Sequence, residues 1–237
     1  MKTFKTLSLP LLVFALAGCS SQSNIEQVYQ PNVDLDALLL RYKVDNGVIN
    51  CDDYRKKVTD CDTLSAELAN LHLRYPNHRR IMLAAAIIYF DVSNIQSSQI
   101  LLDKLLEQNR PAPEAAILRA QIAMSQGSVK TARKVLTKQL DMIPDHANLY
   151  EALSATYYLE GRYKKAQSVL YTADKLGGPS WRTQYHLGLI NEGQKQYSQA
   201  CHFYRQALQI KPDLTVATSR LLSLSLRPSC EPLSASL

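Results

Sequence analysis

The chain has 237 residues, with 27 lysines and arginines against 21 aspartates and glutamates, which gives a formal net charge of +6. The basic residues are scattered among acidic ones, and we find no nucleic-acid-binding motif and no stripe of basic and aromatic residues. This pattern is typical of a solvated surface and excludes nucleic acid as a partner. The chain has only eight glycines, which leaves little material for the loops that build many active sites.

The segment 1–18 has the layout of a signal peptide. Lys2 and Lys5 supply positive charge, and residues 7–17 are almost all apolar. This apolar stretch is shorter than the ~20 residues that span a bilayer, so a permanent transmembrane helix fits poorly. Removal of the segment 1–18 would lower the net charge from +6 to +4, because it carries two lysines and no acid.

Residues 16–19, Leu-Ala-Gly-Cys, resemble the lipobox of bacterial lipoproteins. The resemblance implies that Cys19 receives a diacylglyceryl group and becomes the first residue after cleavage. Several acyl chains anchor a protein stably, whereas one binds only marginally. Because Ser20 rather than aspartate follows the cysteine, the resemblance implies the outer membrane, with the protein facing the periplasm. Residues 19–32 would be a flexible tether. The alternative is ordinary secretory cleavage beside a chance cysteine.

Beyond this segment the sequence repeats with a period of 34 residues, which is the spacing between Ala132, Ala166 and Ala200. A fixed period of this length predicts a linear stack of helical hairpins, in which each hairpin buries its apolar face against its neighbours. We therefore divide residues 79–212 into four repeat frames. The frames begin at Arg79, Pro113, Ala147 and Trp181.

Three columns of these frames predict how the two helices of each hairpin pack. The eighth and twentieth residues are small, so the helix axes can approach closely there. The twenty-fourth residue is bulky and would fill the space beside that contact. The eighth residues are Ala86, Ala120, Ser154 and Gly188, the twentieth are Ser98, Ala132, Ala166 and Ala200, and the twenty-fourth are Leu102, Leu136, Leu170 and Tyr204.

Glycine marks the expected end of the first helix in two frames. Gly127 and Gly161 can adopt the left-handed conformation that such an end requires. The second helices are expected to begin near Ile95, Val129, Tyr163 and Tyr197.

The segments that flank the four frames are expected to close the two ends of the stack. Residues 33–78 would hold a short helix near Asp34 and then, from Asp45 onward, a degenerate repeat or a cap, because its small-residue columns hold larger side chains. Residues 213–226 would form a capping helix, and residues 227–237 a loosely held tail.

The frames resemble the tetratricopeptide repeat family, whose consensus has small residues at positions eight and twenty. The resemblance is weakest in the first frame, where Ser98 and Leu105 replace alanines. It implies an all-α fold, a right-handed α-solenoid of helical hairpins over residues 79–212. The last frame matches the consensus best, at Leu187, Gly188, Tyr197, Ala200, Tyr204, Ala207 and Pro212.

The resemblance also implies a concave groove lined by the second, fifth, ninth and twelfth residues of each frame. These residues are Arg80, Leu83, Ile87, Phe90, Glu114, Ile117, Gln121, Met124, Asn148, Glu151, Ala155, Tyr158, Arg182, Tyr185, Leu189 and Glu192. Such a groove would be rather apolar, which suits an amphipathic helix or an extended hydrophobic segment of a protein partner. Alternatively the protein fills the N-terminal half itself, with Leu35, Leu38, Leu39 and Tyr42 lying against Leu83 and Ile87.

Four cysteines remain after Cys19, and an even number in an oxidising compartment favours disulfides. Proximity in the sequence suggests Cys51 with Cys61 and Cys201 with Cys230. The alternative is four buried free thiols.

The five histidines are dispersed, and the sequence contains no zinc, phosphate-binding or calcium motif and no nucleophile elbow. We therefore expect no metal, no cofactor, no small-molecule substrate and no enzymatic activity. The expected function is that of a scaffold that binds a protein partner in the cell envelope. By its architecture the chain resembles lipoproteins that assist assembly of type IV or tight-adherence pili and secretion pores. The alternatives are an adaptor for cell-wall hydrolases or proteases and a component of polysaccharide export.

Overall fold

The computed structural model describes residues 29–42, 60–225 and 230. The chain divides into two units, residues 1–30 and residues 31–237, and the account below concerns the second. The predicted signal peptide, Cys19, Cys51 and all of the predicted tail except Cys230 lie outside the described residues.

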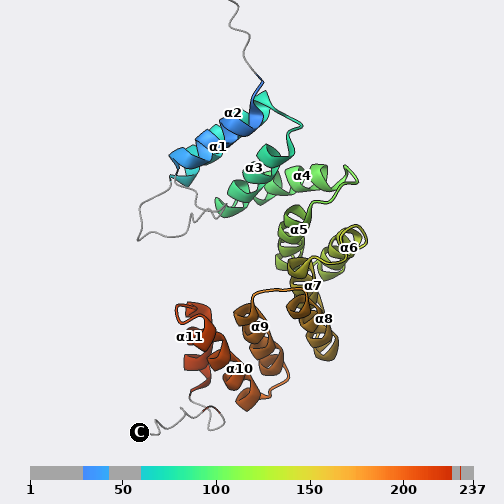
Figure 1. The fold of residues 1–237 in the computed structure, drawn as a ribbon, viewed down its shortest axis with the longest axis vertical. Coiled ribbons are helices and arrows are strands. Elements are labelled where there is room, and N and C mark those ends of the chain that lie inside the picture. The colour runs from blue at the N-terminus through green and yellow to red at the C-terminus, as the bar shows by residue number, and fades with distance from the viewer. Residues whose placement is uncertain (1–28, 43–59, 226–229, 231–237) are drawn as a thin grey trace, which may run out of the picture. The chain divides into compact units, whose positions relative to one another are not determined.

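Every regular element that the structure assigns between Tyr29 and Ser225, leaving aside residues 43–59, is an α-helix (Figure 1). The described helices are α1 (Pro31–Arg41), α2 (Cys61–Arg74), α3 (Arg79–Asp91), α4 (Ile95–Leu106), α5 (Pro113–Ser125), α6 (Val129–Leu140), α7 (Ala147–Leu159), α8 (Tyr163–Lys175), α9 (Ser180–Gly193), α10 (Tyr197–Ile210) and α11 (Thr215–Leu224). No described helix is long and apolar enough to cross a bilayer.

Helices α3 to α10 form four successive hairpins, and each first helix begins within one residue of a predicted frame. Each second helix packs against the first helix of the following hairpin, and the first helices α1, α3, α5 and α7 contact one another in series. This arrangement is an α-solenoid, as the repeat period predicted.

The small residues of the eighth and twentieth columns are buried in all four hairpins. The two columns meet directly, because the Ser98 hydroxyl donates a hydrogen bond of 2.8 Å to the Ala86 carbonyl oxygen. The Ser154 hydroxyl donates a bond of the same length to the Ala166 carbonyl oxygen. Serine is therefore tolerated in either column when its hydroxyl bonds the facing backbone.

The tightest of these contacts lies between α9 and α10. A Cβ atom placed on Gly188 would lie 2.4 Å from Cε1 of Tyr204. The Tyr204 ring is fully buried, and its hydroxyl donates a 2.6 Å hydrogen bond to Glu192. The ring cannot move aside without losing this bond, so only glycine fits at position 188.

The turns between first and second helices share one backbone conformation. Gly127 and Gly161 have φ values of +73° and +69°, in agreement with the predicted helix ends. Ser93 and Lys195, at the equivalent positions of the outer two frames, adopt φ of 62° as well. The packing of the hairpin therefore imposes this turn even where the residue does not favour it.

The N-terminal hairpin is built from α1 and α2 instead of from one repeat frame. Helix α1 contacts both α2 and α3, so it occupies the place of a first helix. Arg41 bonds Glu67 at 2.7 Å, and the Tyr75 hydroxyl donates to Asp34 at 2.6 Å, so the two helices run antiparallel. The residues between them, 43–59, include the predicted first half of the degenerate repeat and lie outside the described residues.

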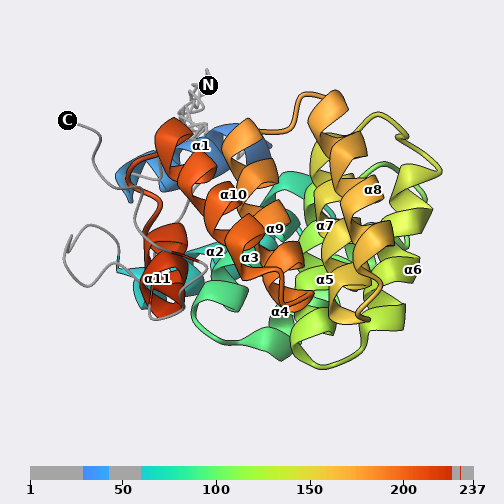
Figure 2. The same cartoon turned by 90° about the horizontal axis from the view of Figure 1, so that it is seen from below.

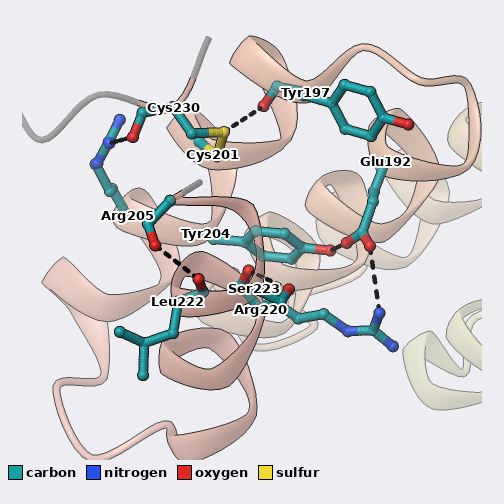
Figure 3. The surroundings of a disulfide bond; sticks show 10 residues. Glu192, Tyr197, Cys201, Tyr204, Arg205, Arg220, Leu222, Ser223 and Cys230 are labelled. Carbon is teal, nitrogen blue, oxygen red and sulfur yellow. Dashed lines mark hydrogen bonds and ion pairs between the residues drawn. A yellow bond between two sulfur atoms is a disulfide. The ribbon is translucent and has the colours of Figure 1, made fainter. Parts of the chain in front are cut away.

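The C-terminal end is closed by α11 and by a disulfide between Cys201 and Cys230, whose Cα atoms are 5.8 Å apart. This is the pairing that the sequence suggested. Arg205 donates a 3.1 Å hydrogen bond to the Cys230 carbonyl oxygen, so the chain at Cys230 is held against α10 (Figure 3). Cys61, the first residue of α2, is also disulfide-bonded.

Replacing Gly188 with alanine tests the small-residue contact. Alanine in a helix interior normally stabilises by up to about 1 kcal/mol relative to glycine. Here the clash with Tyr204 predicts a loss of about 1–3 kcal/mol. Urea unfolding followed by circular dichroism measures the change, and exposed Ser168→Ala is the control. An equal or higher stability of Gly188→Ala would contradict the packing described above.

Candidate binding groove

Three neighbouring first helices, α5, α7 and α9, line a hollow of about 480 Å³. This volume falls within the range of small-ligand pockets. Its walls are Ile117, Gln121, Met124, Asn148, Glu151, Ala152, Ala155, Arg182 and His186. We call this set the central hollow.

Most of the central hollow comes from the columns that the tetratricopeptide resemblance indicated, but Ala152 and His186 do not. Both are the sixth residues of their frames. The sixth residue of α11 in the same register is Arg220, which reaches Glu192 of the preceding first helix at 3.3 Å. The sixth residue of a frame can therefore face the first helix of the preceding hairpin. Including this position with the other groove columns would have found Ala152 and His186 from the sequence.

A charged network lies in the wall of the central hollow. Glu151 has one carboxylate oxygen 3.0 Å from His186 Nε2, and the other accepts a 3.2 Å bond from Arg182 Nη1. Burial by itself would raise the pKa of Glu151, but the hydrogen bond and charge of His186 and Arg182 outweigh it and hold the pKa below its ordinary value. The carboxylate therefore stays ionised and ties α7 to α9.

This network adds charged groups to the rather apolar groove that the resemblance implied. Ile117, Met124, Ala152 and Ala155 supply apolar surface, whereas the remaining residues of the central hollow are polar or charged. The side chain of Arg182 is 38% exposed, so part of the guanidinium still faces solvent. The central hollow can thus receive an apolar side chain beside groups that form hydrogen bonds.

Near its N-terminal end the predicted groove is occupied by the protein itself. Leu35 and Leu38 of α1 are buried in the apolar cluster against which Leu83 and Phe90 pack. Arg80 donates hydrogen bonds to Asn32 at 2.9 Å and to Asp36 at 2.7 Å. Arg80 therefore contacts α1, Leu83 and Phe90 pack against the cluster to which α1 contributes, and Ile87 is only partly buried.

The C-terminal groove positions also have partners within the chain. Tyr185 and Leu189 pack against the cluster that contains Tyr204. Glu192 accepts hydrogen bonds from Tyr204 and Arg220 (Figure 3). Tyr158 belongs to a separate contact, with its ring centroid 5.9 Å from that of Tyr163. The predicted positions that line the central hollow are Ile117, Gln121, Met124, Asn148, Glu151, Ala155 and Arg182.

No group of three or more His, Cys, Asp or Glu side chains among the described residues is arranged to hold a metal ion.

The fold and one repeat agree with the tetratricopeptide class. The family model described as Tetratricopeptide repeat matches residues 182–214, which run from α9 through α10. The described array is accordingly a solenoid of tetratricopeptide-type hairpins. The family model describes a repeat and not a catalytic domain.

Individual relatives are distant. The chain is 22% identical over 158 residues to the TPR repeat-containing protein YpiA of Bacillus subtilis (strain 168), which covers 65% of this chain and 37% of that protein. The chain thus matches little more than a third of that relative's length.

Two solved structures share the fold. The tetratricopeptide protein TTC0263 of Thermus thermophilus superposes with a TM-score of 0.66 at 14% identity, over 83% of this chain and 100% of that one. YrrB, whose structure is described as a TPR protein with an unusual peptide-binding site, superposes with a TM-score of 0.53 at 12% identity, over 83% and 94%. At these identities the likeness concerns the fold alone.

Replacing Glu151 with glutamine tests the charged network. We expect the free energy of unfolding to fall by about 1–2 kcal/mol at pH 7, because Arg182 and His186 lose an ionised acceptor. The folded-state pKa of Glu151 lies below its ordinary 4.5, so its stabilisation is present above that pH and is lost as the pH falls below it. In urea unfolding, the difference in free energy of unfolding between Glu151→Gln and the unmodified chain should be smaller at about pH 3 than at pH 7.

The control is Glu114→Gln, because Glu114 is exposed on α5 and has no hydrogen bond or ion pair within the described residues. A pH-independent difference for Glu151→Gln would show that the network does not contribute through its charge.

Proposed function

We propose that the chain is a scaffold that binds a segment of a protein partner in the central hollow. The observation that carries the proposal is that Ile117, Met124, Ala152 and Ala155 leave room for a side chain between three first helices. On the N-terminal side of the hollow α3 contacts α1, and on the C-terminal side Arg220 of α11 bonds Glu192 of α9. The part of the groove between these contacts is left for a guest.

The lining indicates what the guest contains. Methionine adapts its shape to different apolar side chains, and the two alanines leave space for a large one. Gln121 and Asn148 are at least partly exposed and carry amides, which can both donate to and accept from a peptide backbone. Glu151 already neutralises much of the charge of Arg182. We therefore propose a segment with one large apolar side chain flanked by uncharged polar groups.

Filling the central hollow should abolish binding. A photo-crosslinking amino acid at Gln121 would first capture the partner in cells, with the same group at exposed Thr137 of α6 as the control position. With the purified partner, Ala155→Trp should weaken binding at least about tenfold, because the indole occupies the guest's place.

Thr137→Trp is the matched control and should leave the affinity unchanged. Circular dichroism and thermal unfolding show whether Ala155→Trp remains folded. Met124→Ser provides a second variant that enlarges the site and loses apolar contact. Unchanged affinity in both folded groove variants would overturn the proposal.

We further propose that the partner belongs to a machine of the cell envelope, such as a type IV or tight-adherence pilus or a secretion system. The support is the sequence around Cys19 together with the repeat architecture. In this proposal acyl chains on Cys19 hold the protein to the outer membrane, with the array in the periplasm. An adaptor for cell-wall hydrolases or proteases and a component of polysaccharide export are the alternatives, and the identity of the crosslinked partner separates them.

Replacing Cys19 with serine tests the anchor. Because the thioether to diacylglycerol cannot form, the protein should no longer incorporate labelled palmitate and should leave the membrane fraction on cell fractionation. Ser20→Ala is the control and should stay lipidated. Palmitate labelling of Cys19→Ser equal to that of the unmodified chain would exclude the anchor.

A further inference from the structure

The second helices α6 and α8 present a concentration of exposed lysines. Lys130, Lys134 and Lys138 lie on α6 at intervals of four positions, which places them on one face of the helix. Lys164, Lys165 and Lys175 lie on α8. We call these six residues the lysine face. Lysines that are scattered among other residues in the sequence are therefore concentrated on these two helices in the structure.

Repeat geometry puts Lys130 of α6 and Lys164 of α8 on the same side of the array. Lys130 and Lys164 are one repeat period apart and so occupy equivalent positions in successive hairpins. Helices α6 and α8 both pack against α7, and Figure 2 shows them on the outer side of α5 and α7.

Nearby acids do not neutralise this face. Glu160 is bound by Arg133 and Arg162. The exposed acids on α8 and in the segment after α6 are Asp174, Asp141 and Asp145, three against six lysines. Among the described residues none of these lysines forms an ion pair, and Lys138 alone has a hydrogen bond, of 3.3 Å to Asn109.

A shallow hollow on α8 adds hydroxyl groups to this charge. It measures about 480 Å³ and is lined by Lys164, Gln167, Ser168, Tyr171, Thr172 and Lys175. Ammonium and hydroxyl groups together are donors that suit phosphate oxygens. Tyr171 is 42% exposed, and tyrosine favours the interface between headgroups and water.

We infer that the lysine face binds the surface of an anionic phospholipid bilayer. The lysine ammonium is a strongly hydrated point charge, and lysine is depleted from the cores of protein interfaces. A headgroup layer accepts such a residue without dehydrating it, and each lysine near an anionic surface contributes to binding. An acidic protein is the competing class of partner, and the face offers it little apolar surface to bury.

This contact is compatible with the proposed guest site. The lysine face belongs to the second helices α6 and α8, whereas the central hollow belongs to the first helices α5, α7 and α9. A bilayer bound to the second helices therefore leaves the central hollow accessible. The inference does not depend on acylation of Cys19 or on the identity of a guest.

Co-sedimentation with vesicles tests the inference. The full chain is mixed with vesicles of phosphatidylcholine alone or with about one third phosphatidylglycerol. We expect binding only to the anionic vesicles, and loss of that binding at about 0.5 M salt. Lys134→Glu/Lys164→Glu should weaken it at least about tenfold, given about 1 kcal/mol for each lysine and 1.4 kcal/mol for each factor of ten.

The matched control is Lys195→Glu/Lys211→Glu, which makes the same change of net charge outside the lysine face. It should alter the affinity less than about threefold, and thermal unfolding confirms that both variants fold. Equal loss in the two variants would show a response to net charge alone and would overturn the inference. Equal binding to neutral vesicles, or binding to duplex DNA or to an acidic protein as tight as to anionic vesicles, would overturn it as well.

Ala155→Trp separates this inference from the guest site. It should leave vesicle binding unchanged while abolishing partner binding. The lysine variants should have the opposite effect, so the two proposals can fail independently.

Discussion

The close approach of two helices at pairs of small residues is the constraint on which the rest of the structure depends. Where Ser98 faces Ala86 and Ser154 faces Ala166, a hydroxyl spans the gap to the opposite backbone. Where Gly188 faces Tyr204, a ring fills it. Each solution keeps the two helices of a hairpin at contact distance. Because the same contact recurs once in every repeat, successive hairpins meet in equivalent ways and the array grows by repetition.

Two layers follow from this geometry, and they present different chemistry. First helices α5, α7 and α9 contribute the central hollow, with apolar surface beside a satisfied ionic network. Second helices α6 and α8 contribute exposed lysines. In the two proposals above, the first helices bind a protein segment and the second helices bind a bilayer, so one array would contact two kinds of partner without a second domain.

The Glu151 network places compensated charges beside the apolar surface of the central hollow. Glu151 binds His186 and Arg182 in the bare protein, so its charge is compensated before any partner arrives. A guest then need not supply the counter-charge, and the alanines beside the network remain available for contact. The same ion pairs fix α7 relative to α9, which keeps the site formed before binding and reduces the entropy that binding must overcome.

The sequence alone determined the period, the hairpin boundaries and the small-residue columns, because these depend on side-chain size at fixed spacing along one helix pair. It also indicated most of the central hollow through the resemblance to a repeat family. Tertiary structure decided what depends on neighbours distant in sequence. The use of α1 as a first helix follows from its contacts with α2 and α3. His186 joins the groove through its bond to Glu151 of α7. Ser93 and Lys195 adopt φ of 62° because the hairpin requires that turn. Lys130 and Lys164 lie on the same side because they occupy equivalent positions of stacked repeats.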